Sequence, residues 1–311
     1  MPAIELVEGY RGDDEGINRR IAEIVDSSWG LDPDHAPAIE PTNPEDVREW
    51  FRDEDVETCL LIRSSTLMGF AMMYEMRDYT YLWMEVDLEL VDDATAEIVG
   101  EEIVRWCSRA RARRGFKKPI RASAGLEHGR RHRLFAKMFS HYIALEKVGA
   151  TLMKLVRVPE TIQVPQGFRV REGGVEDYRV VADIYNDAFS VYPWFREWSY
   201  DDAKRHLERR RPLLLIAETL EGEPAGFVAV RVFRALDGRD SAYVSTLAVA
   251  RRFQRRGLGR ALLAQALAKV LKQGVKLDRV FLDSVEGLEE YYGSLGFRGV
   301  RRYVSLYLQT V

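Results

Sequence analysis

The stretch that decides the fold is residues 242–273, AYVSTLAVARRFQRRGLGRALLAQALAKVLKQ. An apolar, β-branched strand runs into a basic turn with two glycines, and apolar residues then recur at helical spacing from Leu258 to Val270. A helix N-terminus presents unpaired N–H groups and the positive end of the macrodipole, and glycine lets an anion approach the backbone. The stretch therefore predicts a pyrophosphate site at a strand-to-helix junction of an α/β protein. Arginines at five positions add positive charge there: Arg251, Arg252, Arg255, Arg256 and Arg260.

Other glycine-rich phosphate motifs fit this stretch less well. The chain has no Walker A string of Gly, four residues, Gly-Lys and Ser or Thr. A Rossmann fingerprint would start its glycines directly after the strand and would place Gly or Ala where Leu262 stands. The alternative that this stretch alone leaves open is a glycine-capped surface turn beside an arginine-rich helix end.

Two motifs in the second half of the chain occur in the order known from one family. Val249, Gln254, Gly257 and Gly259 form V-x-x-x-x-Q-x-x-G-x-G, and residues 291–297 read YYGSLGF. The first motif resembles the acetyl-CoA-binding motif of the GNAT superfamily of N-acetyltransferases, and the second resembles that family's C-terminal Tyr-x-x-x-Gly-Phe segment. The resemblance covers most of 168–311 and implies an acetyl-CoA-dependent N-acetyltransferase.

The resemblance assigns roles to particular residues. Main-chain bonds from the strand would hold the pantetheine arm, the loop and Arg260 would hold the pyrophosphate, and Tyr292 would protonate the departing thiolate. The residue expected to be asparagine is Val285, so Asp283 or Ser284 would supply a hydrogen bond to the pantetheine arm. The other reading of Tyr292 is an aromatic ring packed under the helix. The residues assigned to acetyl-CoA are Leu247, Ala248, Val249, Gln254, Arg255, Arg256, Gly257, Leu258, Gly259, Arg260 and Ser284.

The chain divides at 159–167, PETIQVPQG, where two prolines and a glycine predict a linker. The same order of elements, strand, two helices, hairpin and third strand, is expected in 1–158 and in 168–311. We therefore expect an α/β (mixed α+β) fold with two GNAT-like domains, each a mostly antiparallel sheet flanked by helices. Two unrelated α/β domains that share a hairpin are the alternative.

The first half lacks the cofactor motif. Residues 90–104, LVDDATAEIVGEEIV, have no paired glycines and place carboxylates at the helix start, which would repel a pyrophosphate. Leu145 stands where the second half has Tyr292. We expect 1–158 to be a degenerate domain that binds no CoA and 168–311 to carry the transferase site.

The reaction expected is direct attack of a primary amine on acetyl-CoA. Both cysteines, Cys59 and Cys107, lie in the first half, and the chain has no G-x-S-x-G string that would indicate a covalent intermediate. A base must then take the proton of the amine; the candidates are Glu218, Asp187 and Asp240. Aromatic residues in 185–200 are expected to cover the acceptor side, either as a binding wall or as core.

A basic run, RARARRGFKK, extends from Arg109 to Lys118. It suggests a nucleic-acid-binding or CoA-sensing module as an alternative function, although a cationic helix end capped by Gly115 explains it better. The net charge of -3 and pI of 6.1 indicate no general attraction to nucleic acid. The charged start, the absence of a long apolar run and the Cys and His spacing predict a cytoplasmic protein without a membrane segment or metal site.

Overall fold

The computed structural model describes residues 3–160 and 162–309. The chain folds into two compact units, which we call unit 1 (Met1–Ala150 and Arg301–Val311) and unit 2 (Thr151–Val300). These limits differ from the expected ranges 1–158 and 168–311, because the end of the chain belongs to unit 1. Within the expected linker, 159–167, Thr161 lies outside the described residues, as do 1–2 and 310–311 of the two expected domains.

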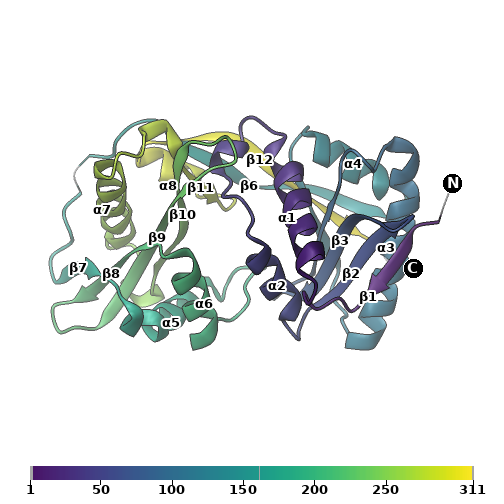
Figure 1. Ribbon diagram of the computed structural model, residues 1–311. Coiled ribbons are helices and arrows are strands. Elements are labelled where there is room, and N and C mark those ends of the chain that lie inside the picture. The colour runs from purple at the N-terminus through teal and green to yellow at the C-terminus, as the bar shows by residue number, and fades with distance from the viewer. Residues whose placement is uncertain (1–2, 161, 310–311) are drawn as a thin grey trace. The chain divides into compact units, whose positions relative to one another are not determined.

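The helices and strands of unit 1 follow the order expected from the sequence (Figure 1). They are β1 (Glu5–Glu8), α1 (Glu15–Gly30), α2 (Pro44–Arg52), β2 (Glu57–Arg63), β3 (Thr66–Glu75), β4 (Thr80–Val86), α3 (Asp93–Arg114), β5 (Ile120–Leu126), α4 (Arg130–Met138) and the first part of β6 (Ile143–Leu155). Strands β1 to β4 pair antiparallel in sequence order, and β4 pairs parallel with β5. One short 3-10 turn, Ala36–Ala38, lies between α1 and α2.

Unit 2 repeats this order. Its elements are the end of β6, β7 (Phe168–Glu172), α5 (Tyr178–Phe189), α6 (Tyr200–Arg210), β8 (Leu213–Thr219), β9 (Pro224–Arg234), β10 (Asp240–Val249), α7 (Leu258–Lys272), β11 (Val280–Ser284), α8 (Glu289–Ser294) and the first part of β12 (Phe297–Leu308). Short 3-10 turns precede α5, α7 and β11, at Val175–Asp177, Arg251–Phe253 and Leu277–Arg279. Strands β7 to β10 pair antiparallel, and β10 pairs parallel with β11.

The last strands of the two repeats are exchanged, which the sequence did not indicate. β6 starts in unit 1, but its residues 151–154 pair antiparallel with β11 in unit 2. β12 starts in unit 2, and its residues 303–308 pair antiparallel with β5 in unit 1. The limits of the two compact units therefore differ from the boundary expected at 159–167, since strand pairing rather than chain position decides which unit these residues join.

The strands of each unit have a helix layer on both faces, as alternation along them requires. In unit 2, Leu215 and Ala217 of β8 pack with α7, whereas Leu214 and Ile216 pack with α5 and α6. In unit 1, α3 and α4 cover one face and α1 and α2 cover the other. Cys59 and Cys107 are fully buried in the first of these two cores.

The helix ends follow capping rules that are visible in the sequence. Asn43 and Asp14 accept hydrogen bonds from the first turns of α2 and α1. Asp92 and Thr95 form a capping box at the start of α3, which ends at Gly115 with φ of 69°. No helix in the described ranges combines the length and the apolar character needed to cross a membrane.

Candidate functional site

The site of interest in unit 2 begins where β10 and β11 separate. The two strands are in parallel register only from Ala242 to Tyr243, whereas β10 continues to Val249. The register of β10 with β9 shifts between Val244 and Thr246, as at a β-bulge, and bulges bend a strand and re-aim its side chains. The edge of β10 that faces β11 is therefore free of strand pairing beyond Tyr243, so its main chain is available to an extended ligand.

A cavity of about 340 Å³ lies at this opening. Its lining residues include the second half of β10, Leu282 and Asp283 of β11, and Tyr292 of α8. Aromatic residues from α5 and the segment before α6 also line it. Its lining therefore combines strand backbone, aromatic rings and one carboxylate.

The loop from β10 to α7 has the conformation of a phosphate-binding turn. Arg255 and Gly257 both have left-handed backbone angles, with φ of 62° and 86°. Gly257 is the N-cap of α7 and supplies no side-chain acceptor, so the first N–H groups of this 15-residue helix have no partner within it. The Gln254 side chain donates to the Val249 carbonyl oxygen at 2.9 Å, which fixes the loop to the end of β10.

The five arginines of this loop differ in their partners. Asp187 pairs with Arg251 at 3.1 Å, and Glu223 pairs with Arg252. Arg260 donates to the Ser294 hydroxyl at 2.8 Å. The remaining two, Arg255 and Arg256, are exposed and have no carboxylate partner among the residues described. Arg260 also keeps its full charge, because a hydroxyl is a neutral acceptor, so Arg255, Arg256 and Arg260 supply the positive charge available to an anion at this loop.

A second cavity, of about 400 Å³, connects the loop with Tyr292. It is lined by residues 257–260 and by Tyr291 and Tyr292 of α8. It shares Val249, Gln254 and Tyr292 with the first cavity, so the two are neighbouring parts of one groove. A Cβ atom on Gly259 would lie 2.9 Å from the Tyr291 hydroxyl oxygen. The absence of a side chain at Gly259 therefore makes room for the Tyr291 hydroxyl at the start of α7.

Tyr292 is half-buried between the two cavities. Its ring packs edge-on against Tyr291, at 5.1 Å between centroids, and against Phe297. Burial, followed by the neighbouring Tyr291 and Tyr192, raises the pKa of the Tyr292 phenol above its usual value of 10. The phenol is therefore protonated at neutral pH and faces the groove as a hydrogen-bond donor.

The structure gathers nearly all the residues assigned to acetyl-CoA around this groove. Residues 247–249, Gln254 and Tyr292 line its first part, and residues 254–260 except Arg256 line its second part. Ser284 does not line either cavity: it is fully buried and donates to the Val285 carbonyl oxygen. Its neighbour Asp283 lines the groove and accepts a hydrogen bond from the Tyr243 phenol.

The three carboxylates considered as bases lie elsewhere. Glu218 binds Arg169 and Arg171 at 2.7 and 3.0 Å, and although burial opposes it, these hydrogen bonds lower the pKa of its carboxyl group. Asp187 binds Arg251, and Asp240 pairs with Arg234. Asp283, one of the two residues expected beside the pantetheine arm, lines the opening instead.

In the corresponding region of unit 1, side chains occupy the gap between β4 and β5, and a cavity of about 230 Å³ remains beside Arg131. β4 and β5 are in register only over 80–82 and 120–122. Beyond this point, Arg131 donates to the Met84 and Ser123 carbonyl oxygens and to the Glu85 carboxylate. At the start of α3, the Asp92 side chain accepts a hydrogen bond from the Thr95 N–H at 2.9 Å. In unit 1, its own side chains thus bind to the strand edge between β4 and β5 and to the start of α3, the two places that would contact a cofactor.

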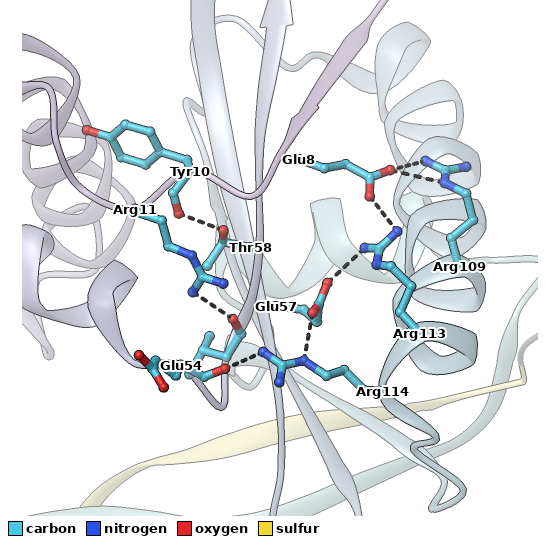
Figure 2. Close-up of polar contacts among 10 residues, drawn as sticks. Glu8, Tyr10, Arg11, Glu54, Glu57, Thr58, Arg109, Arg113 and Arg114 are labelled. Atoms are coloured by element: carbon cyan, nitrogen blue, oxygen red, sulfur yellow. Dashed lines mark hydrogen bonds and ion pairs between the residues drawn. The ribbon is translucent and has the colours of Figure 1, made fainter.

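Three arginines of the basic run 109–118 form ion pairs with nearby carboxylates. Figure 2 shows Arg109 and Arg113 on Glu8, and Arg113 and Arg114 on Glu57. The distances are 2.7 to 2.8 Å. These two carboxylates offset part of the positive charge of the run.

The fold and groove agree with comparisons to known proteins. Residues 178–297 match the family model described as Acetyltransferase (GNAT) family. This part of the chain is a GNAT-family domain, and the chain as a whole has a tandem GNAT fold. A comparison of the sequence with curated proteins gave no match.

Solved structures resemble nearly the whole chain. A GCN5-related N-acetyltransferase from Sphaerobacter thermophilus is 16% identical with a TM-score of 0.63, covering 97% of this chain and 94% of that one. A tandem GNAT protein from the clavulanic acid biosynthesis pathway is 15% identical with a TM-score of 0.66, covering 97% of each. An acetyltransferase of the GNAT family from Colwellia psychrerythraea is 12% identical with a TM-score of 0.60, covering 98% and 99%. Identities this low show the fold alone.

No group of three or more His, Cys, Asp or Glu side chains suited to a metal ion occurs within 3–160 and 162–309.

Proposed function

We propose that the chain transfers the acetyl group of acetyl-CoA to a primary amine, and that unit 2 carries the site. The observation that carries the proposal is the continuous groove that joins the free edge of β10, the glycine loop at the start of α7, and Tyr292. Neither cysteine of the chain lies in unit 2, which supports direct attack by the amine without a thiol intermediate.

Successive parts of the groove suit successive parts of acetyl-CoA. The main chain of 247–249 would pair with the pantetheine arm, and the N–H groups at the start of α7 with Arg255 and Arg256 would bind the pyrophosphate. Ser284, whose hydroxyl is already engaged, is left out of this proposal. Unit 1 would bind no CoA, because Arg131 and Asp92 occupy the equivalent positions.

Bound acetyl-CoA supplies the acetyl group as a thioester. Transfer forms one N–C bond and breaks one C–S bond, and an ammonium acceptor loses two protons in all. The Tyr292 phenol gives its proton to the CoA sulfur, one of the two ammonium protons restores the phenol, and the other passes to solvent. A free thiol has a pKa of about 8.5 and burial raises the pKa of Tyr292 above 10, so the transfer from Tyr292 to a thiolate is uphill.

Calorimetric titration with acetyl-CoA tests the proposal. We expect saturable binding that is lost in Gly257→Asp, because an aspartate there adds strain at φ of 86° and places a carboxylate against the pyrophosphate. Gly274→Asp is the matched control. Gly274 has φ of 94° just beyond the other end of α7, and a Cβ atom added there would have no neighbouring atoms within 4 Å. A wild-type chain that binds no acetyl-CoA, or that releases no CoA with any primary amine, would refute the proposal.

A further inference from the structure

Aromatic rings of α5 and of the segment before α6 line one part of the groove, and we call them its aromatic wall. Tyr185 and Trp198 stack with their centroids 3.9 Å apart and their planes at 7°. Tyr192 and Trp194 stack at 5.1 Å and 19°. Rings in such positions offer a large apolar contact area, and their faces attract cations. The wall therefore suits the apolar body of a ligand and repels an anion.

This wall is held in place by the segment that carries it. The Asn186 side chain of α5 accepts a hydrogen bond from the Trp198 N–H and donates to the Trp198 carbonyl oxygen, both at 2.8 Å. These two hydrogen bonds tie the two ends of the segment 186–198 to each other. A wall fixed in this way loses little conformational entropy when a ligand binds.

A single carboxylate, Asp283, lines this cavity, and neither lysine nor arginine does so within the described residues. Asp283 is exposed at the end of β11, and the Tyr243 phenol donates a hydrogen bond to it. Arg231 lies over the Tyr243 ring at 5.6 Å. A carboxylate accepts several hydrogen bonds, so Asp283 keeps capacity for a further donor. The cavity, which His206 of α6 also lines, therefore presents one carboxylate beside aromatic rings.

We infer that the acceptor is a small primary amine in which a cationic ammonium group is joined to a compact apolar or aromatic body. The ammonium would bind the Asp283 carboxylate, and the body would lie against the rings of Tyr185 and Trp198. This inference rests on the proposed transferase function. It makes Asp283 a residue that selects the acceptor, and it disfavours amino sugars and acidic amines, which would leave polar groups unpaired against the rings.

An acceptor panel scored by release of free CoA tests the inference. The probes are 2-phenylethylamine, butylamine, glucosamine and a lysine-containing peptide, each with acetyl-CoA in excess. We expect kcat/KM for 2-phenylethylamine to exceed that of each of the other three by at least tenfold. Selection of the peptide or of glucosamine would overturn the inference while leaving the transferase proposal intact.

Variants separate the two features of the cavity. Asp283→Asn should raise KM for 2-phenylethylamine at least tenfold and leave the acetyl-CoA dissociation constant unchanged. The matched control is Asp278→Asn, an exposed aspartate five residues earlier that lines neither part of the groove. Trp198→Leu should reduce the preference for 2-phenylethylamine over butylamine, with circular dichroism and acetyl-CoA affinity as checks of folding.

The outcomes distinguish the two proposals. If acetyl-CoA binds but 2-phenylethylamine is not consumed, or if Asp283→Asn behaves like Asp278→Asn, the inference is wrong. If no acetyl-CoA binds at all, the transferase proposal itself is wrong, and the inference is wrong with it.

Discussion

The Arg131 guanidinium and the Glu85 carboxylate meet through two hydrogen bonds, of 2.8 and 2.9 Å, where β4 and β5 separate in unit 1. Both residues are buried, and Ser28, Trp29 and Trp83 donate to the same carboxylate. Unit 2 leaves the corresponding place, beside β10, as a groove. One fold thus holds an open strand edge in one unit and a satisfied ion pair in the other.

The Glu85–Arg131 pair should contribute strongly to the stability of unit 1. Glu85→Gln would leave the Arg131 charge buried without a counter-ion, and breaking a buried pair in this way costs about 3–5 kcal/mol. Glu101→Gln is the control, since the Glu101–Arg105 pair is largely exposed and pairs of that kind contribute about 1 kcal/mol or less. Urea unfolding followed by tryptophan fluorescence measures both; similar losses in the two variants would contradict the expectation.

His35 should make the stability of unit 1 sensitive to mild acid. Burial lowers the pKa of His35 from 6.5 to about 4, and its Nε2 lies 2.9 Å from the Tyr303 hydroxyl. Between these two pKa values the unfolded chain binds the proton that the folded chain excludes, so stability is full above pH 6.5 and falls as the pH drops toward 4. The loss attributable to His35 is of the order of 3 kcal/mol.

Urea unfolding at pH 7 and pH 4.5 tests this prediction. His35→Gln should flatten the dependence on pH, whatever it does to stability at pH 7. His141→Gln, a substitution at an exposed histidine, should keep the wild-type dependence. Equal pH dependence in wild type and His35→Gln would show that another group is responsible.

Local chemistry explains why the GNAT-type loop of unit 2 could be predicted from sequence. Alternation, helical spacing and one glycine at positive φ, Gly257, are all encoded within 242–273, and the structure places these elements as expected. The repeated order of elements was also visible, because each hairpin and helix has its own local pattern.

Long-range pairing explains what could not be predicted. β6 and β12 carry similar strand patterns, so nothing local tells which sheet each one joins. Arg131 and Glu85 are 46 residues apart, and no spacing rule connects them. Alternation places Asp283 and Ser284 on opposite faces of β11, but only the fold shows that Asp283 faces the groove.

Arg255 and Arg256 should each make an electrostatic contribution to the acetyl-CoA affinity of the loop. Each lacks a carboxylate partner among the residues described, so Arg255→Gln or Arg256→Gln should weaken binding roughly tenfold, or about 1.4 kcal/mol. The effect should shrink at about 0.5 M salt, because exposed charges are largely screened at that ionic strength.

Arg252→Gln is the control for this comparison, because Arg252 is already paired with Glu223. Calorimetry should find its acetyl-CoA affinity close to that of wild type. A larger loss in Arg252→Gln than in the other two variants would mean that the ion pairs of the free protein do not persist when acetyl-CoA binds.

Tyr292→Phe should separate catalysis from binding. If the phenol protonates the departing sulfur, its loss should lower kcat by roughly 10²-fold or more and leave acetyl-CoA affinity nearly unchanged, since general acids contribute about 10²–10⁴-fold. Tyr291→Phe is the matched control, because Tyr291 precedes it on α8 and its hydroxyl lies toward Gly259 rather than at the β10–β11 opening. Because burial holds the pKa of Tyr292 above 10, ionisation of this phenol should not reduce the wild-type kcat between about pH 7 and 9.5. Steady-state rates with a saturating amine decide the matter: an equal fall in both phenylalanine variants would assign Tyr292 to packing rather than to proton transfer.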